Sequence, residues 1–400
     1  MIEKLTIESF KSLESVSIDL GLVNVFIGSN GSGKSNLLEA LGVLSAAADG
    51  KVNDQTLLQR GVRPGVPSLY KSAFRPQPGQ SRRLSPHIFF GAQSYGNARY
   101  EVSLNNPLRD PKPAWSFKHE LCQRGEEQIV GRSPRTHPRP NPEQGLAALK
   151  AVELQPDDMA LKLLQELQGY VIYTPSTSVL RGTTSEGQPR NPIGLSGGQL
   201  PDALRHVLMS RSDSPHAFEV CENALELIDW ATDYGSALAT TIPLSPSAAA
   251  SARVVRFVDR YMSPKRNVLS GYDASEGALY VLFLAVLAAH ESSPPLCAID
   301  NADHGLNPRL ARELMSKACY WFLNGPRVRQ ILLTTHNPLV LDGLPLQNDR
   351  VRLFTVSRTS SGRTDVRRIV ISEDLRRKAA EGWTLSRLWV MGHLGGIANV

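Results

Sequence analysis

The sequence predicts an α/β fold with a mixed sheet core, into which a mainly helical lobe is inserted. Three apolar runs have the length and composition of buried strands, at 22–27, 296–300 and 330–335. Helical patterns follow the first run and separate the other two, and this alternation of strands and helices favours a parallel sheet. The strand runs lie in the two end portions of the 400-residue chain, so the segment between them is interpreted as an insert.

The elements near the N-terminus are predicted from local patterns. Residues 2–8 and 15–20 alternate apolar and polar side chains and predict a strand pair, while residues 87–104 predict a hairpin. A helix is expected to begin at Ser35. Residues 61–86 and 105–145 are interpreted as loops, because the prolines along the second segment argue against an interior helix or a central strand.

The remaining elements follow in order. Residues 199–262 are mainly helical in pattern, with an interruption near Pro243 and Pro246, and residues 351–371 predict a late hairpin around Ser360. The other expected elements are helices at 156–168, 276–290 and 308–322 and a short strand at 170–174. The expected organisation is thus one half of the core at 1–105, a loop-rich and then helical lobe at 106–270, the second half of the core at 271–360, and a hairpin strand and tail at 361–400.

Composition narrows the class of protein. A hydrophobic content of 41%, a charged content of 20% and a formal net charge of +6 are ordinary for a soluble globular chain. No run reaches the roughly 18 apolar residues of a membrane helix, and the N-terminus lacks the apolar segment of a signal peptide. The four cysteines have no CxxC spacing, which argues against a zinc site. We therefore expect a cytoplasmic protein without a membrane partner.

A glycine-rich motif follows the first buried strand. Residues 28–35, Gly-Ser-Asn-Gly-Ser-Gly-Lys-Ser, fit the phosphate-loop pattern GxxxxGK[ST] without a mismatch, and they lie between a predicted strand and a predicted helix. In such a loop backbone N–H groups surround phosphates, the lysine neutralises phosphate oxygens, and the serine hydroxyl reaches Mg²⁺. The sequence thus predicts a site for ATP and Mg²⁺ at Asn30, Gly31, Ser32, Gly33, Lys34, Ser35 and Asn36.

Two further motifs complete the expected site. The strand run 296–300 ends in Asp300, the form of a Walker B strand, whose carboxylate holds the magnesium ion together with Ser35. The next strand is followed by His336, whose side chain can reach a γ-phosphate. The expected metal ligands are therefore Ser35 and Asp300.

These motifs together resemble the ABC-type ATPases of the SMC/RecF branch. The resemblance rests on Leu5–Ile7, on 10–13 (Phe-Lys-Ser-Leu), on the phosphate loop through Asn36, and on residues 270–344. It implies the P-loop fold of ABC and SMC heads, an ATP-dependent homodimer or higher oligomer, and a nucleotide site shared between two copies. The chain is most similar to single-chain ATPases of anti-phage systems, such as the ATPase subunit of the Septu system and relatives in retron operons.

In this family the second copy supplies a signature serine, and two segments compete for that role. Residues 195–199 spell LSGGQ, while Asp273-Ala274-Ser275-Glu276-Gly277 has the looser form of the SMC/RecF branch. A signature opens the helix that leads into Walker B, a distance of roughly 25 residues. Ser275 lies 25 residues before Asp300 and Ser196 lies 104 before it, so we assign the signature to Ser275, Glu276 and Gly277. The LSGGQ string is then a glycine turn before a helix.

The residue after Asp300 departs from the family pattern. The resemblance implies a glutamate there that polarises the attacking water, but this chain has Asn301, which cannot accept a proton. Asp303 either substitutes for it or is an ordinary loop carboxylate, and the sequence leaves both interpretations open. Residues 306–308 match the family's D-loop, which would cross the dimer interface.

Other features bear on partners. Basic residues in two loops (Arg75, Arg82 and Arg83; Arg132, Arg135, His137 and Arg139) either contact DNA or RNA or are simply solvated. The apolar tail residues Trp383, Leu385, Leu388, Trp389 and Leu394 either dock on the chain's own core or bind a partner. Gln93 is the only suggestion of a Q-loop. There is no long heptad region, and the absence of an acidic DxD cluster in the tail suggests that the chain has no nuclease of its own.

Three functions are thus weighed. The first is an ATP-gated switch that works with a separate effector, for which a nuclease is the expected class. The second is a RecF-like ATPase of DNA repair or recombination. The third, the nucleotide-binding subunit of an ABC transporter, is disfavoured by the signature spacing and by the lack of a clear Q-loop.

Overall fold

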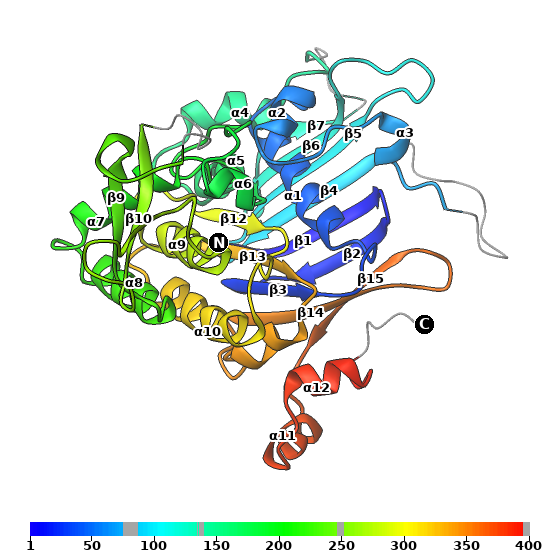
Figure 1. Ribbon diagram of the computed structural model, residues 1–400. Helices are drawn as coiled ribbons and strands as arrows, with labels where there is room; N and C mark the ends of the chain where they lie inside the picture. The colour runs from blue at the N-terminus through cyan, green and yellow to red at the C-terminus, as the bar shows by residue number, and fades with distance from the viewer. Residues whose placement is uncertain (75–86, 134, 136–139, 246–251, 395–400) are drawn as a thin grey trace.

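Two six-stranded sheets enclose one long helix at the centre of the molecule (Figure 1). The computed structural model describes residues 1–400 except 75–86, 134, 136–139, 246–251 and 395–400. The central helix is α1 (Lys34–Ala48), and all but two of its residues are buried. It is buried on every side because it contacts strands of both sheets.

The first sheet is antiparallel and is built mostly from the N-terminal part of the chain. Its strand order is β2-β1-β4-β5-β6-β7. The strands are β1 (Ile2–Phe10), β2 (Leu13–Asp19), β4 (Ile88–Ser94), β5 (Ala98–Asn105), β6 (Ser116–Arg124) and β7 (Glu127–Arg132). Three short helices lie around it: α2 (Asp54–Leu58), α3 (Pro67–Tyr70) and α4 (Leu146–Lys150).

The second sheet joins the two ends of the chain and carries the predicted motifs. Its order is β15-β14-β3-β13-β12-β8, with all neighbours parallel except the edge pair β14 and β15. The strands are β3 (Val23–Ile27), β8 (Val171–Tyr173), β12 (Leu296–Ile299), β13 (Gln330–Thr335), β14 (Val351–Arg358) and β15 (Thr364–Ile369). Because these strands are parallel, the carboxyl ends of β3, β8, β12 and β13 meet at one edge.

The second sheet is apolar on both faces because it separates two cores. On β13, Leu332 faces the core around α1, whereas Ile331 and Leu333 face a second core of helices. This matches the continuous apolar runs of its strands. Helix α5 (Met159–Gly169) packs against α1 within the first of these cores. The helices outside the α1 layer are α6 (Thr177–Leu180), α7 (Leu200–Ser210), α8 (Pro215–Leu227), α9 (Glu276–Ala289), α10 (Pro308–Asn324), α11 (Glu373–Ala380) and α12 (Leu385–Val390).

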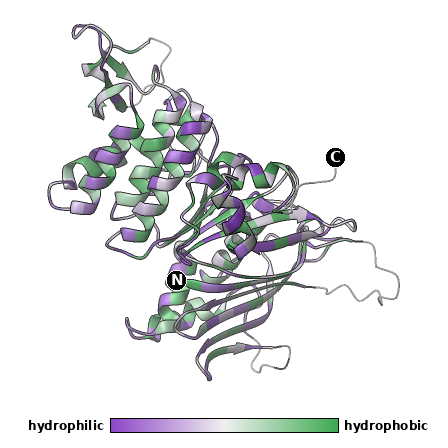
Figure 2. Cartoon of the chain, turned by 90° about the horizontal axis from the view of Figure 1, so that it is seen from below, coloured by the Kyte–Doolittle hydropathy of each residue, from purple (hydrophilic) through white to green (hydrophobic). Residues whose placement is uncertain are grey.

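A small third sheet lies beyond the helices. It has the order β11-β10-β9, with β9 (Ala231–Leu238), β10 (Arg253–Asp259) and β11 (Val268–Ser270). Figure 2 shows it at the outer end of the helical lobe, away from the two large sheets. Among the described residues, no helix is both long and apolar enough to cross a membrane.

Most of the expected elements are confirmed, and two segments are corrected. The interpretation of 105–145 as a loop is wrong for β6 and β7: the prolines cluster at either end, and the proline-free segment between them is free to pair. The helical interpretation of 199–262 is right for α7 and α8 but wrong for β9 and β10. There Val255 and Phe257 alternate with less buried neighbours and face the core as in a strand.

The structure also places the apolar tail and part of the basic loops. Leu388, Trp389 and Leu394 are buried in the helical core, so the tail docks on its own chain. Arg132 is 4% exposed and donates through Nη2 to Gln144 O at 2.5 Å, so it does not lie on an exposed loop as expected. Arg75, Arg82, Arg83, His137 and Arg139 lie outside the described residues.

One buried amide ties the two halves of the chain together. Gln330, at the start of β13, is 1% exposed. Its Nε2 donates to Ile2 O at 2.8 Å and to Gly21 O at 2.6 Å, and its Oε1 accepts from Ile2 N at 3.0 Å. This side chain thus holds the first strand and the β2–β3 turn against the C-terminal half of the core.

We predict that Gln330→Leu lowers the free energy of unfolding by roughly 2–4 kcal/mol, because it removes three hydrogen bonds from buried backbone groups of Ile2 and Gly21. Urea unfolding measures the change. The matched control is Gln55→Leu at an exposed position of α2. Equal stability of the two variants would contradict the assigned role.

Candidate functional site

The loop 28–35 connects β3 to α1 and allows no side chain at two of its glycines. A Cβ on Gly28 would lie 2.1 Å from Val356 O, and one on Gly33 would lie 2.2 Å from Thr364 Oγ1. Gly33 also has φ +111°, in the region that favours glycine, and it caps the N-terminus of α1. Gly31 has open space around it, and it lies with Asn30 at the exposed tip. The loop therefore presents backbone N–H groups and a helix N-terminus to one concave side.

The loop is supported from behind by the β14–β15 hairpin. Thr364 Oγ1 lies 2.7 Å from Ser12 Oγ and 2.7 Å from Ser32 O, while Asn36 Nδ2 donates to Ser12 Oγ at 2.7 Å. Arg358 Nε donates to Gly31 O at 2.8 Å. These contacts fix the loop's shape before any ligand binds. The buried Ser32 Oγ has no hydrogen-bond partner among the described residues.

Lys34 extends across the loop. Its ammonium donates to Gly28 O at 2.8 Å and Ser29 O at 3.0 Å, and it lies 3.3 Å from His336 Nδ1. Burial lowers the pKa of Lys34 to about 8, although the charges of Asp300 and Asp303 oppose the shift. The ammonium is therefore a poorly solvated cation, held by carbonyl oxygens that an anion can replace.

Asp300 directly follows β12, and its carboxylate is held by one residue of α1 and one residue of β13. Ser35 Oγ donates to its Oδ2 at 2.8 Å, and Thr334 Oγ1 donates to its Oδ1 at 2.5 Å. The Thr334 hydroxyl also accepts from Asn301 N at 2.8 Å. The two residues predicted as metal ligands are thus adjacent, and Thr334, which the sequence analysis did not single out, orients the carboxylate.

Asn301 occupies a left-handed backbone conformation, with φ +57°. Asparagine is one of the few non-glycine residues that adopt it readily, so the local turn favours Asn at this position irrespective of catalysis. Asn301 is exposed beside Asp300, while Asp303 Oδ1 accepts from His336 N at 3.4 Å. Burial, and then the charge of Lys34, lower the pKa of His336, which favours the neutral ring at pH 7.

The predicted signature opens α9 as expected. Ser275 is its N-cap and accepts from Ala278 N, and Gly277 packs so close to Leu310 that a Cβ would lie 2.8 Å from its Cδ2. Glu276 accepts from Thr177 Oγ1 and lies 3.2 Å from His304 Nδ1. Among the described residues, no hydrogen bond or ion pair joins 275–277 to the loop 28–35. Of these three residues Ser275 is exposed, whereas Gly277 is buried.

The LSGGQ string forms a turn before α7, as the spacing argument predicts. Gly197 has φ +99°, and Glu186 Oε2 accepts from Ser196 N at 3.0 Å and Gly198 N at 3.1 Å. Ser196 O accepts from Ser176 N at 3.1 Å. Its contacts are thus internal and support the loop that follows β8.

That loop is a part of the site that the sequence did not reveal. Thr174, Ser176, Thr177 and Ser178 line a cavity of about 470 Å³ together with Asp300, Asn301 and His304. Its position depends on the pairing of β8 with β12, a long-range contact without a local pattern. Gln93, by contrast, lies within β4 and pairs with Lys4 and Arg99.

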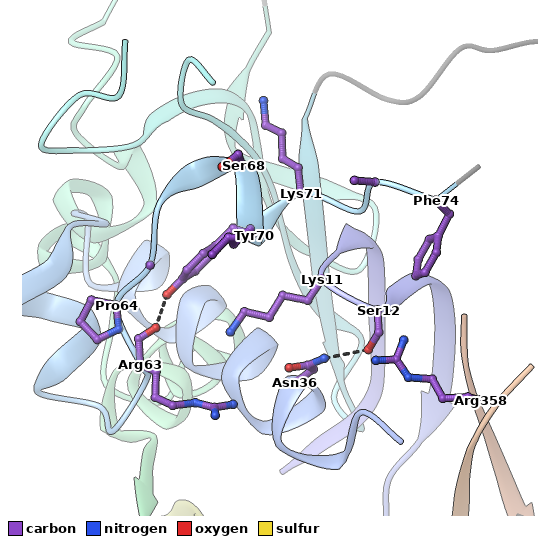
Figure 3. A pocket seen from close by; sticks show the side chains of 13 residues that line it. Lys11, Ser12, Asn36, Arg63, Pro64, Ser68, Tyr70, Lys71, Phe74 and Arg358 are labelled. Atoms are coloured by element: carbon purple, nitrogen blue, oxygen red, sulfur yellow. Dashed lines mark hydrogen bonds between the residues drawn. The ribbon is translucent and has the colours of Figure 1, made fainter. Parts of the chain in front are cut away.

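A second cavity, of about 590 Å³, lies on the other side of the loop (Figure 3). Its lining includes four cationic side chains and no carboxylate: Lys11, Arg63, Lys71 and Arg358. Glu39 accepts hydrogen bonds from two of these cations: one from Lys11 Nζ, and one from Arg63 Nε at 2.6 Å. Tyr70 and Phe74 add aromatic walls. The cavity therefore combines positive charge with flat apolar surface.

The residues present fit a polyphosphate with a divalent cation. The loop offers backbone donors, an unpartnered Ser32 hydroxyl and the Lys34 ammonium, and Ser35 with Asp300 offers two adjacent oxygen ligands of the kind that Mg²⁺ prefers. The cationic cavity beside the loop has room for the remainder of a nucleotide. These features belong to one surface, formed where the two ends of the chain meet.

Two domain models match parts of the chain. Residues 1–72 match a family described as an AAA ATPase domain, and residues 233–342 match one described as "AAA domain, putative AbiEii toxin, Type IV TA system". The two matches include the phosphate loop and the segment from Ser275 to His336.

Curated relatives match over shorter segments. The DNA replication and repair protein RecF of Renibacterium salmoninarum is 47% identical over 112 residues, which are 27% of this chain and 26% of that protein. RecF of Rhodococcus erythropolis is 30% identical over 162 residues, or 40% of this chain and 30% of that protein. The matched segments thus span less than a third of these relatives.

Solved structures match over nearly the whole chain. An SMC head bound to the C-terminal winged-helix domain of ScpA superposes with a TM-score of 0.54 at 14% identity, covering 94% of this chain and 99% of that one. An SMC head with an extended coiled coil, bound to a ScpA domain from Pyrococcus furiosus, gives 0.50 at 12% identity, covering 95% and 98%. The chain therefore has the P-loop fold of an SMC-type head of the ABC class, with sequence similarity to RecF in the matched segments.

Proposed function

We propose that this chain is an ATP-dependent switch: an ATPase that dimerises head to head and regulates a separate effector. The observation that carries the proposal is the convergence of Lys34, Ser35, Asp300 and His336 at one edge of the second sheet, beside the cationic cavity. Parallel strands bring together residues from both ends of the chain, and the resulting donor set fits ATP and Mg²⁺.

Each residue has a role in this proposal. Loop 28–33 and Asn36 surround the phosphates, Lys34 neutralises them, and Ser35 with Asp300 holds the metal, which when bound neutralises charge on the phosphates and polarises them. Lys11 and Arg63 lie where a phosphate near the nucleoside would reach. The neutral ring of His336 contacts the Lys34 ammonium and lies where it can bond to the terminal phosphate.

The exposed signature supports a site shared by two copies. Ser275 caps α9 yet contacts nothing in its own phosphate loop, so it is free to approach the loop of another copy. Within its own chain, Glu276 contacts Thr177 and His304, which adjoin the cavity at Asp300. We propose that these contacts link each signature to its own chain's catalytic cavity.

Slow turnover follows from the residue next to Asp300. The Asn301 amide can orient water but cannot take its proton, and Asp303 is engaged with the backbone N–H of His336. A long-lived ATP-bound dimer suits a regulator that holds an effector in check. We propose a nuclease as the effector and anti-phage defence as the setting, with DNA or RNA as a further partner. The AbiEii toxin description of the family that matches residues 233–342 fits a conflict-related role.

A RecF-like role in DNA repair is the second candidate. The 47% identity to RecF over 112 residues favours it. In that case the chain acts on DNA itself and needs no effector. Purification of the native complex with ATP separates the two candidates, because a co-purifying nuclease supports the switch and DNA alone supports the repair role.

The first prediction concerns the phosphate loop. Lys34→Ala abolishes binding of a fluorescent ATP analogue, because it removes the cation nearest the loop's phosphate-binding side. Titration of the purified chain measures this. Undiminished binding of the analogue by Lys34→Ala would contradict the proposal.

The pH profile of the wild type is an independent check on Lys34. Because its pKa is about 8, the ammonium loses its proton as the pH rises through that value. Affinity for the analogue should therefore fall roughly tenfold between pH 7 and pH 9. In Lys34→Arg the guanidinium stays charged, so a profile equally steep in that variant would assign the titration to another group.

The second prediction separates the two signature candidates. Ser275→Arg blocks ATP-dependent dimerisation, because a bulky cation would occupy the place of a terminal phosphate across the interface. Ser196→Arg leaves dimerisation intact. Size-exclusion chromatography with light scattering measures both, and the reverse pattern would make LSGGQ the signature.

The third prediction concerns water activation. Asn301→Glu speeds hydrolysis, with general-base help worth about 10²–10⁴ in rate, even though the left-handed turn costs Glu about 1–2 kcal/mol. Asn301→Asp is the matched control, because aspartate tolerates this backbone better. Asp303→Asn then tests the wild type: a sharp loss makes Asp303 the base. Brisk wild-type turnover that survives Asp303→Asn would contradict the slow switch.

A further inference from the structure

The turn between β10 and β11 gathers positive charge around an exposed aromatic ring. Residues 260–266, Arg-Tyr-Met-Ser-Pro-Lys-Arg, are all exposed. Tyr261 is 79% exposed and Met262 is 43% exposed. A tyrosine so open to water has no packing role, so its presence at the tip calls for another explanation.

The turn holds these side chains outward by a fixed backbone. Asp259 Oδ1 accepts from Tyr261 N at 2.7 Å and from Met262 N at 2.9 Å, and Asp259 N donates to Asn267 O at 2.7 Å. Arg266 N donates to Ser263 O at 2.7 Å. The display of Tyr261 is thus built into the β10–β11 turn.

The cations of the turn have no ion-pair partner among the residues that the structure describes. Nearby, Arg256 pairs with Asp233, but within the described ranges no ion pair involves Arg260, Lys265 or Arg266. Among the described residues, the Arg260 guanidinium makes a single hydrogen bond, from Nη2 to Ala231 O at 3.1 Å. Three cations therefore flank one free aromatic face, and Asp259 is the only carboxylate in the turn.

We propose that the β10–β11 turn binds a single-stranded segment of nucleic acid, with Arg260, Lys265 and Arg266 on phosphates and Tyr261 stacked on a base. An unpaired base offers the face that a duplex conceals, so the exposed ring favours a single strand. This inference deepens the proposed function, because it assigns a surface to the nucleic-acid partner named there.

The position of the turn leaves the nucleotide site open. The small sheet lies on the opposite side of the molecule from α3, which lines the cationic cavity (Figure 1). At its other end β11 stops at Ser270, five residues before the signature serine, and Gly271 N donates to Val255 O of β10 at 2.7 Å. A nucleic-acid strand bound at the turn therefore contacts the β10–β11 hairpin, which leads directly to the proposed signature serine.

Fluorescence anisotropy on the full chain tests the surface, with oligothymidylate, oligouridylate and duplex DNA of roughly 20 nucleotides or base pairs as probes. No ATP is added, so the result does not depend on the ATP site. Tyr261→Ala should weaken single-strand binding by at least about fivefold, and Tyr261→Phe should stay near wild type. Lys265→Ala with Arg266→Ala should reduce the slope of log affinity against log salt by about 1.4.

The matched control removes two exposed cations elsewhere, by Arg109→Ala with Lys112→Ala in the β5–β6 loop. Equal weakening in that control would overturn the proposal, as would unchanged binding in Tyr261→Ala. Duplex binding as tight as single-strand binding would also overturn it. Equal competition by polyglutamate would contradict it too, because that result would indicate an acidic protein partner. Thymidylate and uridylate results distinguish DNA from RNA. If ATP binding fails while oligonucleotide binding and its loss in Tyr261→Ala persist, the ATPase proposal falls and this surface stands.

Discussion

The contact between Ser35 and Asp300 is the constraint around which the rest of the site is arranged. These residues are far apart in sequence, and their 2.8 Å hydrogen bond requires β3, β13 and β12 to lie side by side and parallel. Thr334 completes the arrangement by holding the other carboxylate oxygen. The proposed magnesium site, made of one hydroxyl and one carboxylate, therefore depends on the pairing of strands from both ends of the chain.

Several buried polar contacts stabilise that closure. Gln330 binds the backbone of Ile2 and Gly21, while Thr364 binds Ser12 and the phosphate loop. In both cases a residue from the C-terminal half satisfies groups from the N-terminal half. Because unpaired buried polar groups are costly, these contacts favour the register that aligns the motifs.

The sequence predicted the features that depend on local patterns, and it missed those that depend on long-range strand pairing. The phosphate loop, the strand that ends before Asp300 and the helix that follows Ser275 are each continuous patterns, and Ser275 lies at the start of α9 as expected. Thr334 and the Thr174–Ser178 loop join the site only through strand pairing, so no local pattern identified them. Strands β6 and β7 were missed because prolines on both sides dominated the segment. Asn301 has a conformational explanation, its φ of +57°, which no sequence pattern predicts.

The central claim is that a complete site needs the phosphate loop of one copy and the signature of another. Mixing two inactive variants, Lys34→Ala and Ser275→Arg, tests it most directly, with ATP hydrolysis as the readout. In the mixed dimer, one site combines an intact loop with an intact signature, so activity absent from each variant alone should return on mixing. If the mixture stays inactive although the two variants associate, or if Ser275→Arg alone hydrolyses ATP normally, the shared-site account is wrong.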